Sequence, residues 1–188
     1  MVKFVQIRAS SGNDADTWFD SYWAGAKSVG SGSDRLILGV THTFESDTDP
    51  VVQAKFFHEQ VTKGGTYDGD LPPAVDVEHN PGKLDKETFA NQLKIMMETC
   101  SSLFGQRCSI YTGYGVWSRL VAENNWAQDY PLWVAMWIDR NPADYPTLPR
   151  EWANNGKTAY MWQYIVRADG RDFGVSSERL DHDRYWVD

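Results

Sequence analysis

Short apolar segments alternate with helical segments along the whole chain, and this order limits the folds that the sequence can adopt. Alternating strands and helices predict parallel strands with helices outside, either in a closed barrel or in an open doubly wound sheet. No glycine-rich phosphate loop follows the first expected strand, which favours the barrel. The expected strands are Val2–Ala9, Arg35–Thr43, Pro72–Glu78, Arg107–Thr112, Leu132–Trp137, Thr158–Ile165 and Arg179–Trp186. These are seven where a complete barrel has eight, so we predict an incomplete TIM-like β/α barrel of the α/β class.

The helical segments carry their own start and stop signals. Asp49 followed by Pro50 is an N-cap with proline at the first helical position, and Asp85 is a second N-cap. Gly105 is expected to end the longest helix. The expected helices are Asp16–Val29, Pro50–Val61, Asp85–Phe104 and Tyr114–Ala122. On one face of the first we expect Trp18, Phe19, Tyr22 and Ala26.

The composition argues against several classes of function. A formal net charge of −8 disfavours nucleic acid, which needs clustered Lys and Arg, and gives no attraction to anionic membranes. No apolar stretch approaches the roughly 20 residues of a transmembrane helix, and Met1–Arg8 lacks the features of a secretory signal. Four histidines and no Cys-x-x-Cys argue against a metal site, and no cofactor is expected.

The 188 residues contain no repeat, low-complexity tract or linker, so we expect a single domain spanning residues 1–188. Cys100 and Cys108 could pair across the turn Ser101–Arg107, but two cysteines make no disulfide framework, which favours free thiols. Nine Trp, nine Tyr and eight Phe make the chain unusually aromatic. Aromatic faces stack on sugar rings as well as filling cores, so this enrichment mildly favours a carbohydrate ligand.

Two carboxylates end the segment Leu71–Glu78 at a spacing of i, i+2. Side chains alternate along a strand, so Asp76 and Glu78 are expected on one face and Val75 and Val77 on the other. Their Cα atoms would lie roughly 6.6 Å apart. An acid pair at a strand end favours glycosidic-bond chemistry, with ordinary surface acids as the alternative.

Eight segments along nearly the whole chain form a recognisable series of motifs: Lys3–Ser10, Gly39–Phe44, Gln53–Phe57, Leu71–Glu78, Ile110–Gly113, Pro131–Ala135, Trp162–Tyr164 and Leu180–Tyr185. Taken in this order, they resemble glycoside hydrolase family 25, the Chalaropsis-type lysozymes found in many phage endolysins.

This resemblance implies an irregular β/α barrel that hydrolyses the β-1,4 bond between N-acetylmuramic acid and N-acetylglucosamine in bacterial peptidoglycan. It implies no separate wall-binding module within the chain. Glu78 resembles the family's proton donor, and Asp76 resembles the partner that orients the reacting N-acetyl group or stabilises the oxocarbenium charge. Asp181 resembles a further acid of the cleft, although it could instead join a surface network with its charged neighbours His182, Asp183 and Arg184.

The chain departs from the family pattern at its start. The family opens with a strand bearing Asp-x-Ser and a helix, ahead of the segment matched here by Lys3–Ser10, so that strand and its active-site Asp are expected to be absent. Either the chain has lost a catalytic carboxylate, which could weaken activity, or it is a truncated form of a longer product. A gap in a barrel exposes unpaired backbone, and we therefore expect a homodimer or a rearranged terminus covering the edge.

The remaining candidate residues are placed as substrate-binding groups. Tyr111 and Trp133 stand at strand ends, where they could also be core residues. Gln163 faces opposite to its aromatic neighbours and suits hydrogen bonding to substrate or between barrel layers. Arg8 is expected to pair with one of the acids. His42 lies where the family usually has Tyr-His, with a hydrogen-bonded interior histidine as the alternative.

Three functions are therefore in competition. The first is a muramidase that acts on the bacterial cell wall after release by lysis, as a phage endolysin does, or by an export route without a signal peptide. The second is a catalytically impaired descendant that binds glycan or serves in assembly. The third is a family 18-like chitinase. Such an enzyme would need an Asp-x-x-Asp-x-Asp-x-Glu motif, and Pro72 and Pro73 occupy those positions here.

Overall fold

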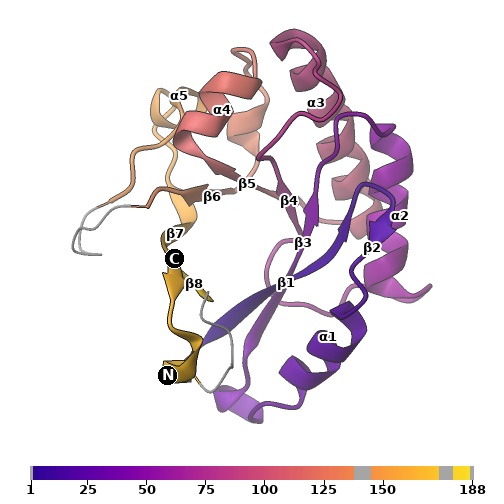
Figure 1. The fold of residues 1–188 in the computed structure, drawn as a ribbon, viewed down its shortest axis with the longest axis vertical. Helices are drawn as coiled ribbons and strands as arrows, with labels where there is room; N and C mark the ends of the chain where they lie inside the picture. Colours follow the sequence, from indigo (N-terminus) through magenta and orange to yellow (C-terminus); the bar gives the residue numbers. More distant parts are fainter. Residues whose placement is uncertain (1, 138–144, 174–179, 187–188) are drawn as a thin grey trace.

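A computed structural model of the chain describes residues 2–137, 145–173 and 180–186. Within these residues, eight strands form one mixed sheet in the order β2-β1-β3-β4-β5-β6-β7-β8 (Figure 1). The neighbours from β1 to β7 in this order pair in parallel, whereas β2 and β8 pair antiparallel with β1 and β7. The strands are β1 Phe4–Ser11, β2 Asp14–Ala15, β3 Ile37–Thr43, β4 Ala74–Asp76, β5 Ser109–Gly113, β6 Leu132–Ala135, β7 Ala159–Ala168 and β8 Leu180–Tyr185.

The sheet curls until its two ends approach each other. The rings of Phe4 on β1 and Tyr185 on β8 have centroids 5.9 Å apart, although no backbone pairing between these strands occurs in the described residues. Figure 1 shows the strands around an open centre with α1 to α4 outside. The prediction of an irregular, incomplete α/β barrel is confirmed. A homodimer covering its edge stays a prediction.

All seven expected strands are present, but two details differ. The two-residue strand β2 was not expected. The expectation that every strand runs parallel is wrong for β8, which forms an antiparallel pair with β7. A parallel pair needs a crossover of a dozen or more residues, and the connection from Ala168 to Leu180 is shorter.

The helices confirm their predicted caps. The helices are α1 Phe19–Lys27, α2 Pro50–Thr62, α3 Lys86–Phe104, α4 Tyr114–Leu120 and α5 Arg150–Ala153. Asp49 accepts hydrogen bonds from the backbone of Val51 and Val52, and Asp85 does the same at the start of α3. Gly105 ends α3 in the left-handed conformation at φ 65°. Neither α3 nor any other described helix has the length and apolar character needed to cross a membrane.

Two apolar clusters occupy the two sides of the sheet. The larger lies between the strands and the helices and includes Phe57, Phe89 and Leu93, all fully buried. The smaller fills the barrel interior with Leu71, Ala74, Tyr111, Trp133, Ala135 and Met161. Cys100 and Cys108 are both buried free thiols, as predicted.

The residues expected on one face of α1 differ in burial. Phe19 is buried and Trp23 packs beside it, whereas Trp18 and Tyr22 are 63% and 57% exposed. Phe19 and Trp23 form one i, i+4 row of the helix, and Trp18 and Tyr22 form the next row, about 100° around the axis. Only the first row faces the sheet.

Two glycines should respond oppositely to alanine. Gly25 lies inside α1, and an added Cβ would meet nothing within 4 Å, so Gly25→Ala should raise the free energy of unfolding by about 0.5–1 kcal/mol. Gly105 has a positive φ, so Gly105→Ala should lower it by about 1 kcal/mol. Urea unfolding checks both, and shifts of the same sign would contradict the two conformations.

Candidate active site

The acid pair lies where β4 ends. Asp76 is the last residue of β4, in register with Thr43 on β3 and Tyr111 on β5. Val75 and Val77 belong to the cluster under the helices, so Asp76 faces the barrel interior, as strand alternation predicts. The strand was expected to continue to Glu78. It ends two residues earlier, and Glu78 stands in the loop beyond it.

Asp76 is a mostly buried carboxyl group with one oxygen unused. Thr43 donates to its Oδ2 at 3.1 Å. Its Oδ1 is buried and has no hydrogen-bond partner among the described residues. Burial, followed by the charge of Glu78, raises the pKa of Asp76 to about 7. Burial and an unpaired oxygen both make the ionised form of this carboxyl group unfavourable.

Glu78 has a raised pKa as well. Burial is the largest cause, and the charge of Asp181 adds to it, while His79 and a hydrogen bond with Tyr111 oppose it. The like charges act differently on the two acids: the charge of Glu78 raises the pKa of Asp76, whereas the charge of Asp181 raises the pKa of Glu78.

Strand β8 contributes a second acid pair across the interior. Asp181 Oδ2 accepts from Gln163 Nε2 at 3.3 Å, and Asp183 Oδ1 accepts from Trp133 Nε1 at 2.8 Å. Burial raises the pKa of Asp181, and burial raises that of Asp183 to about 7. Asp183 was grouped with surface charges in the sequence. Its i, i+2 spacing from Asp181, the same as in the first pair, was the signal that could have placed it inside.

Tyr111 stands between the two acid pairs. Burial raises its pKa first, followed by the charges of all four acids, Glu78, Asp76, Asp183 and Asp181. Its hydroxyl donates to Gln163 Oε1 at 2.8 Å.

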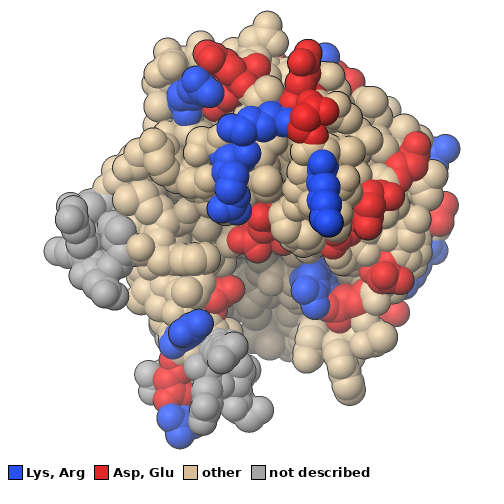
Figure 2. Space-filling model, turned by 45° about the horizontal axis from the view of Figure 1, so that its top comes forward, with Lys and Arg blue, Asp and Glu red and all other residues tan. Residues whose placement is uncertain are grey.

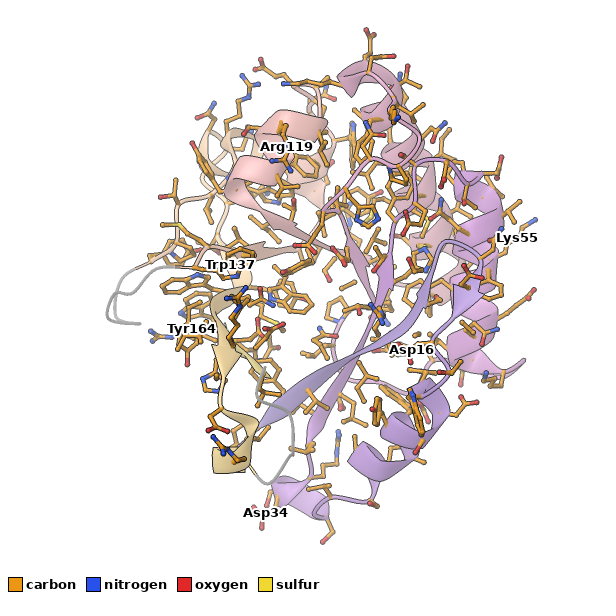
Figure 3. The ribbon with its side chains drawn as sticks, in the orientation of Figure 1. Asp16, Asp34, Lys55, Arg119, Trp137 and Tyr164 are labelled. Atoms are coloured by element: carbon orange, nitrogen blue, oxygen red, sulfur yellow. The ribbon has the colours of Figure 1, made fainter. Side chains whose placement is uncertain are left out.

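Gln163 links Tyr111 to Trp137 at the rim of the barrel interior. Its Oε1 also accepts from Trp137 Nε1 at 2.9 Å, so its NH₂ group is left for Asp181. Trp137 is 57% exposed, and the sequence analysis missed it as a site residue. Figure 3 shows Trp137 and Asp16 on opposite sides of the open centre.

Three predicted substrate-binding residues, Trp133, Arg8 and His42, are not placed for a simple contact with a sugar. Trp133 is only 5% exposed, with its ring 4.5 Å from that of Tyr111, so it is a wall of the interior. Arg8 does not hydrogen-bond to the acid pair; it donates to Asp16 at 3.1 Å, although its charge lowers the pKa of Asp76.

His42 points away from the interior. It is fully buried, bonds to Ser10 at 2.8 Å and Gln53 at 3.2 Å, and stacks on Phe57 of α2. Burial lowers its pKa to about 4. The placement supports the alternative of a hydrogen-bonded interior histidine, because Thr41 and Thr43 are the residues of β3 that alternate toward the acids.

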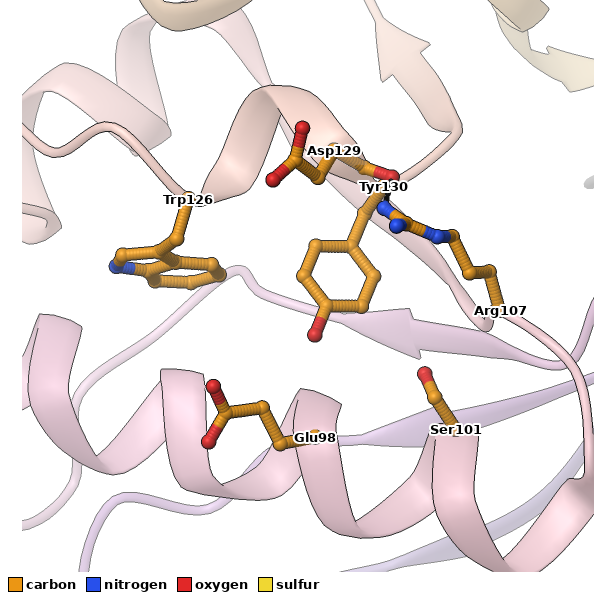
Figure 4. Close-up of a pocket in the computed structure, with 6 residues that line it drawn as sticks. All are labelled: Glu98, Ser101, Arg107, Trp126, Asp129 and Tyr130. Carbon is orange, nitrogen blue, oxygen red and sulfur yellow. Dashed lines mark hydrogen bonds between the residues drawn. The ribbon is translucent and has the colours of Figure 1, made fainter.

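Figure 2 shows a face that is hollowed in its middle, with acidic side chains at the margin of the hollow. A separate depression lies between α3 and the segment after α4 (Figure 4). Arg107 there donates to the Asp129 carbonyl and lies over the Tyr130 ring, and none of the four acids lines this depression.

In the described part of the chain no group of three or more His, Cys, Asp or Glu side chains could hold a metal ion.

Comparison with known proteins decides the family. The sequence pattern of Glycosyl hydrolases family 25 matches residues 1–170. The chain belongs to this family. No curated protein sequence matches it.

Solved structures share the fold of this family 25 chain. A muramidase from Acremonium alcalophilum is 23% identical with a TM-score of 0.77, and the match covers 99% of this chain and 83% of that one. A family GH25 lysozyme from Aspergillus fumigatus is 26% identical with a TM-score of 0.74 and the same coverage. A lysozyme from Streptomyces coelicolor is 22% identical with a TM-score of 0.75, covering 97% of this chain and 81% of that one.

The raised pKa of Asp76 makes a prediction about stability. The folded state holds this proton up to about pH 7, whereas an unfolded Asp releases it near pH 4, so stability falls as pH rises through that window. Asp76→Asn removes the titration. Its urea midpoint relative to that of the wild type should therefore rise between pH 5 and pH 8.

The control is Asp169→Asn, because Arg171 lowers the pKa of that exposed carboxyl group. The difference between the urea midpoint of Asp169→Asn and that of the wild type should stay constant over the same pH range. A constant difference for Asp76→Asn as well would contradict the burial of its charge.

Proposed function

We propose that this chain is a peptidoglycan hydrolase of the muramidase type, cleaving the β-1,4 bond between N-acetylmuramic acid and N-acetylglucosamine. The observation that carries the proposal is Glu78, an acid of raised pKa beyond the end of β4, beside Asp76 with a free buried oxygen. Family membership and neighbours described as muramidases and lysozymes support it. The cell wall of bacteria is then the place of action.

Glu78 is the proton donor in this proposal. Its raised pKa keeps the carboxyl group protonated nearer to neutral pH than an ordinary Glu, and the proton goes to the glycosidic oxygen as the bond to the anomeric carbon breaks. The resulting carboxylate then accepts a proton from the water that completes the hydrolysis, which restores the acid.

Asp76 supports the positive charge that develops on the sugar. Its Oδ1 accepts the N–H of the substrate's acetamido group, and that contact orients the acetamido oxygen toward the anomeric carbon. Burial raises the pKa of both acids, and the charge of Glu78 raises the pKa of Asp76 further. One acid and one carboxylate are what the reaction requires.

The first test removes the proton donor. Glu78→Gln should lower the rate at which a peptidoglycan suspension loses turbidity by at least about 100-fold, because general acid catalysis is lost while the shape is kept. The control Glu123→Gln changes an exposed acid that pairs with Arg150 and should act like the wild type.

A wild type without activity would instead favour the second candidate, a glycan-binding or assembly domain. Release of products from chitin but not from peptidoglycan would favour the chitinase alternative.

The second test concerns the rim. Trp137 is exposed, and its N–H is fixed on Gln163, so its ring suits stacking on a sugar. Trp137→Ala should raise KM about five- to tenfold with kcat changed less than about twofold, because the stacking is made in ground state and transition state alike. Tyr22→Ala, an exposed aromatic of α1, is the control. A lower kcat at constant KM would contradict a binding role.

A further inference from the structure

One hydrogen bond of the interior joins strands that are not neighbours in the sheet. Trp133 Nε1 on β6 donates to Asp183 Oδ1 on β8 at 2.8 Å, while β7 lies between the two strands. The bond therefore crosses the interior face of β7. Trp133 is 5% exposed, and an indole N–H at such a depth is unfavourable without an acceptor.

Trp133 in turn packs against Tyr111. Their ring centroids are 4.5 Å apart with the planes tilted by 58°. The Tyr111 hydroxyl donates to Gln163 Oε1 and lies close enough to Glu78 to lower the pKa of that acid. A rotation of the Trp133 ring would therefore move the hydroxyl that lies beside the proposed proton donor.

The acceptor of the indole is an acid placed among acidic and phenolic groups. Asp181 on the same strand raises the pKa of Asp183, and the phenols of Tyr111 on β5 and Tyr160 on β7 both feel its charge. Tyr185, further along β8, packs against Tyr160. Burial is the largest cause of the raised pKa of Asp183, about 7, so its charge appears near neutral pH. An ionised acceptor holds an N–H donor more strongly than a neutral one.

We propose that Asp183 is a positioning residue, whose carboxyl group fixes the Trp133 indole and through it the Tyr111 hydroxyl beside Glu78. This inference rests on the proposed glycosidase function. Its Oδ1 accepts the N–H of Trp133, so the role that we assign to Asp183 is indirect. It acts by holding the geometry of the acid, and it holds that geometry more firmly once it is ionised.

Three variants test the role in catalysis. Asp183→Asn keeps an acceptor, Asp183→Leu removes it, and Trp133→Phe removes the donor. We expect Asp183→Leu and Trp133→Phe to lower kcat about tenfold with KM nearly unchanged, and Asp183→Asn to retain most of kcat, with a weaker dependence on pH around 7.

The matched control is Trp152→Phe. Trp152 is 1% exposed and donates its N–H to the Tyr130 carbonyl at 2.9 Å, outside the acid group. This variant should keep the wild-type kcat. A loss as large as in Trp133→Phe, or a loss confined to KM in the Asp183 and Trp133 variants, would overturn the proposal.

A spectroscopic readout separates this proposal from the proposed function. In the NMR spectrum, the indole N–H resonance that disappears in Trp133→Phe should shift with pH around a midpoint near 7, and Asp183→Asn should abolish the shift. A resonance that does not titrate, or that titrates unchanged in Asp183→Asn, overturns the proposal. A titrating resonance in a wild type inert on peptidoglycan would contradict the glycosidase function alone.

Discussion

Alternation of residues along the strands of a curled sheet places most side chains of the candidate site, and Glu78 and Trp137 lie just beyond the ends of β4 and β6. Of two successive residues along a strand, one packs in the layer under the helices and the next faces the barrel interior. On β4 this separates Val75 from Asp76, and on β3 it separates His42 from Thr43. On β8 it puts Asp181 and Asp183 on the interior side, where they contact Gln163 and Trp133. The interior thus collects the polar groups that the helix-covered layer excludes.

The electrostatic consequence is a group of four carboxyls whose pKa values are all raised, by burial in the first place. Such a cluster opposes folding when it is fully ionised, since a buried charge without a partner is unfavourable. Thr43 and Trp133 each compensate one carboxyl in part with a hydrogen bond. The remaining unfavourable energy is what keeps protons on acids near neutral pH, which a glycosidase acid requires. Burial of these acids therefore lowers the stability of the fold and, at the same time, supports the proposed activity.

The sequence was sufficient for features that depend on local chemistry. The caps at Asp49, Asp85 and Gly105 follow from side-chain and backbone geometry within a few residues. The interior position of Asp183 and the outward position of His42 were accessible as well, because both follow from counting along a strand. The fixed position of Trp137 was not accessible. It depends on Gln163, which reaches it from another strand and is itself oriented by Tyr111 from a third. The face of α1 that is buried depended on which of two adjacent aromatic rows meets the sheet, and helical periodicity alone does not distinguish them.

The Tyr111 hydroxyl links the state of the proposed acid to the rest of the site. It carries one proton, which it donates here to Gln163 Oε1, so it cannot at the same time donate fully to Glu78. A protonated Glu78 fits this arrangement, because its own O–H can be directed at the Tyr111 oxygen. An ionised Glu78 would be the stronger acceptor, so it would compete with Gln163 Oε1 for the single proton of the Tyr111 hydroxyl.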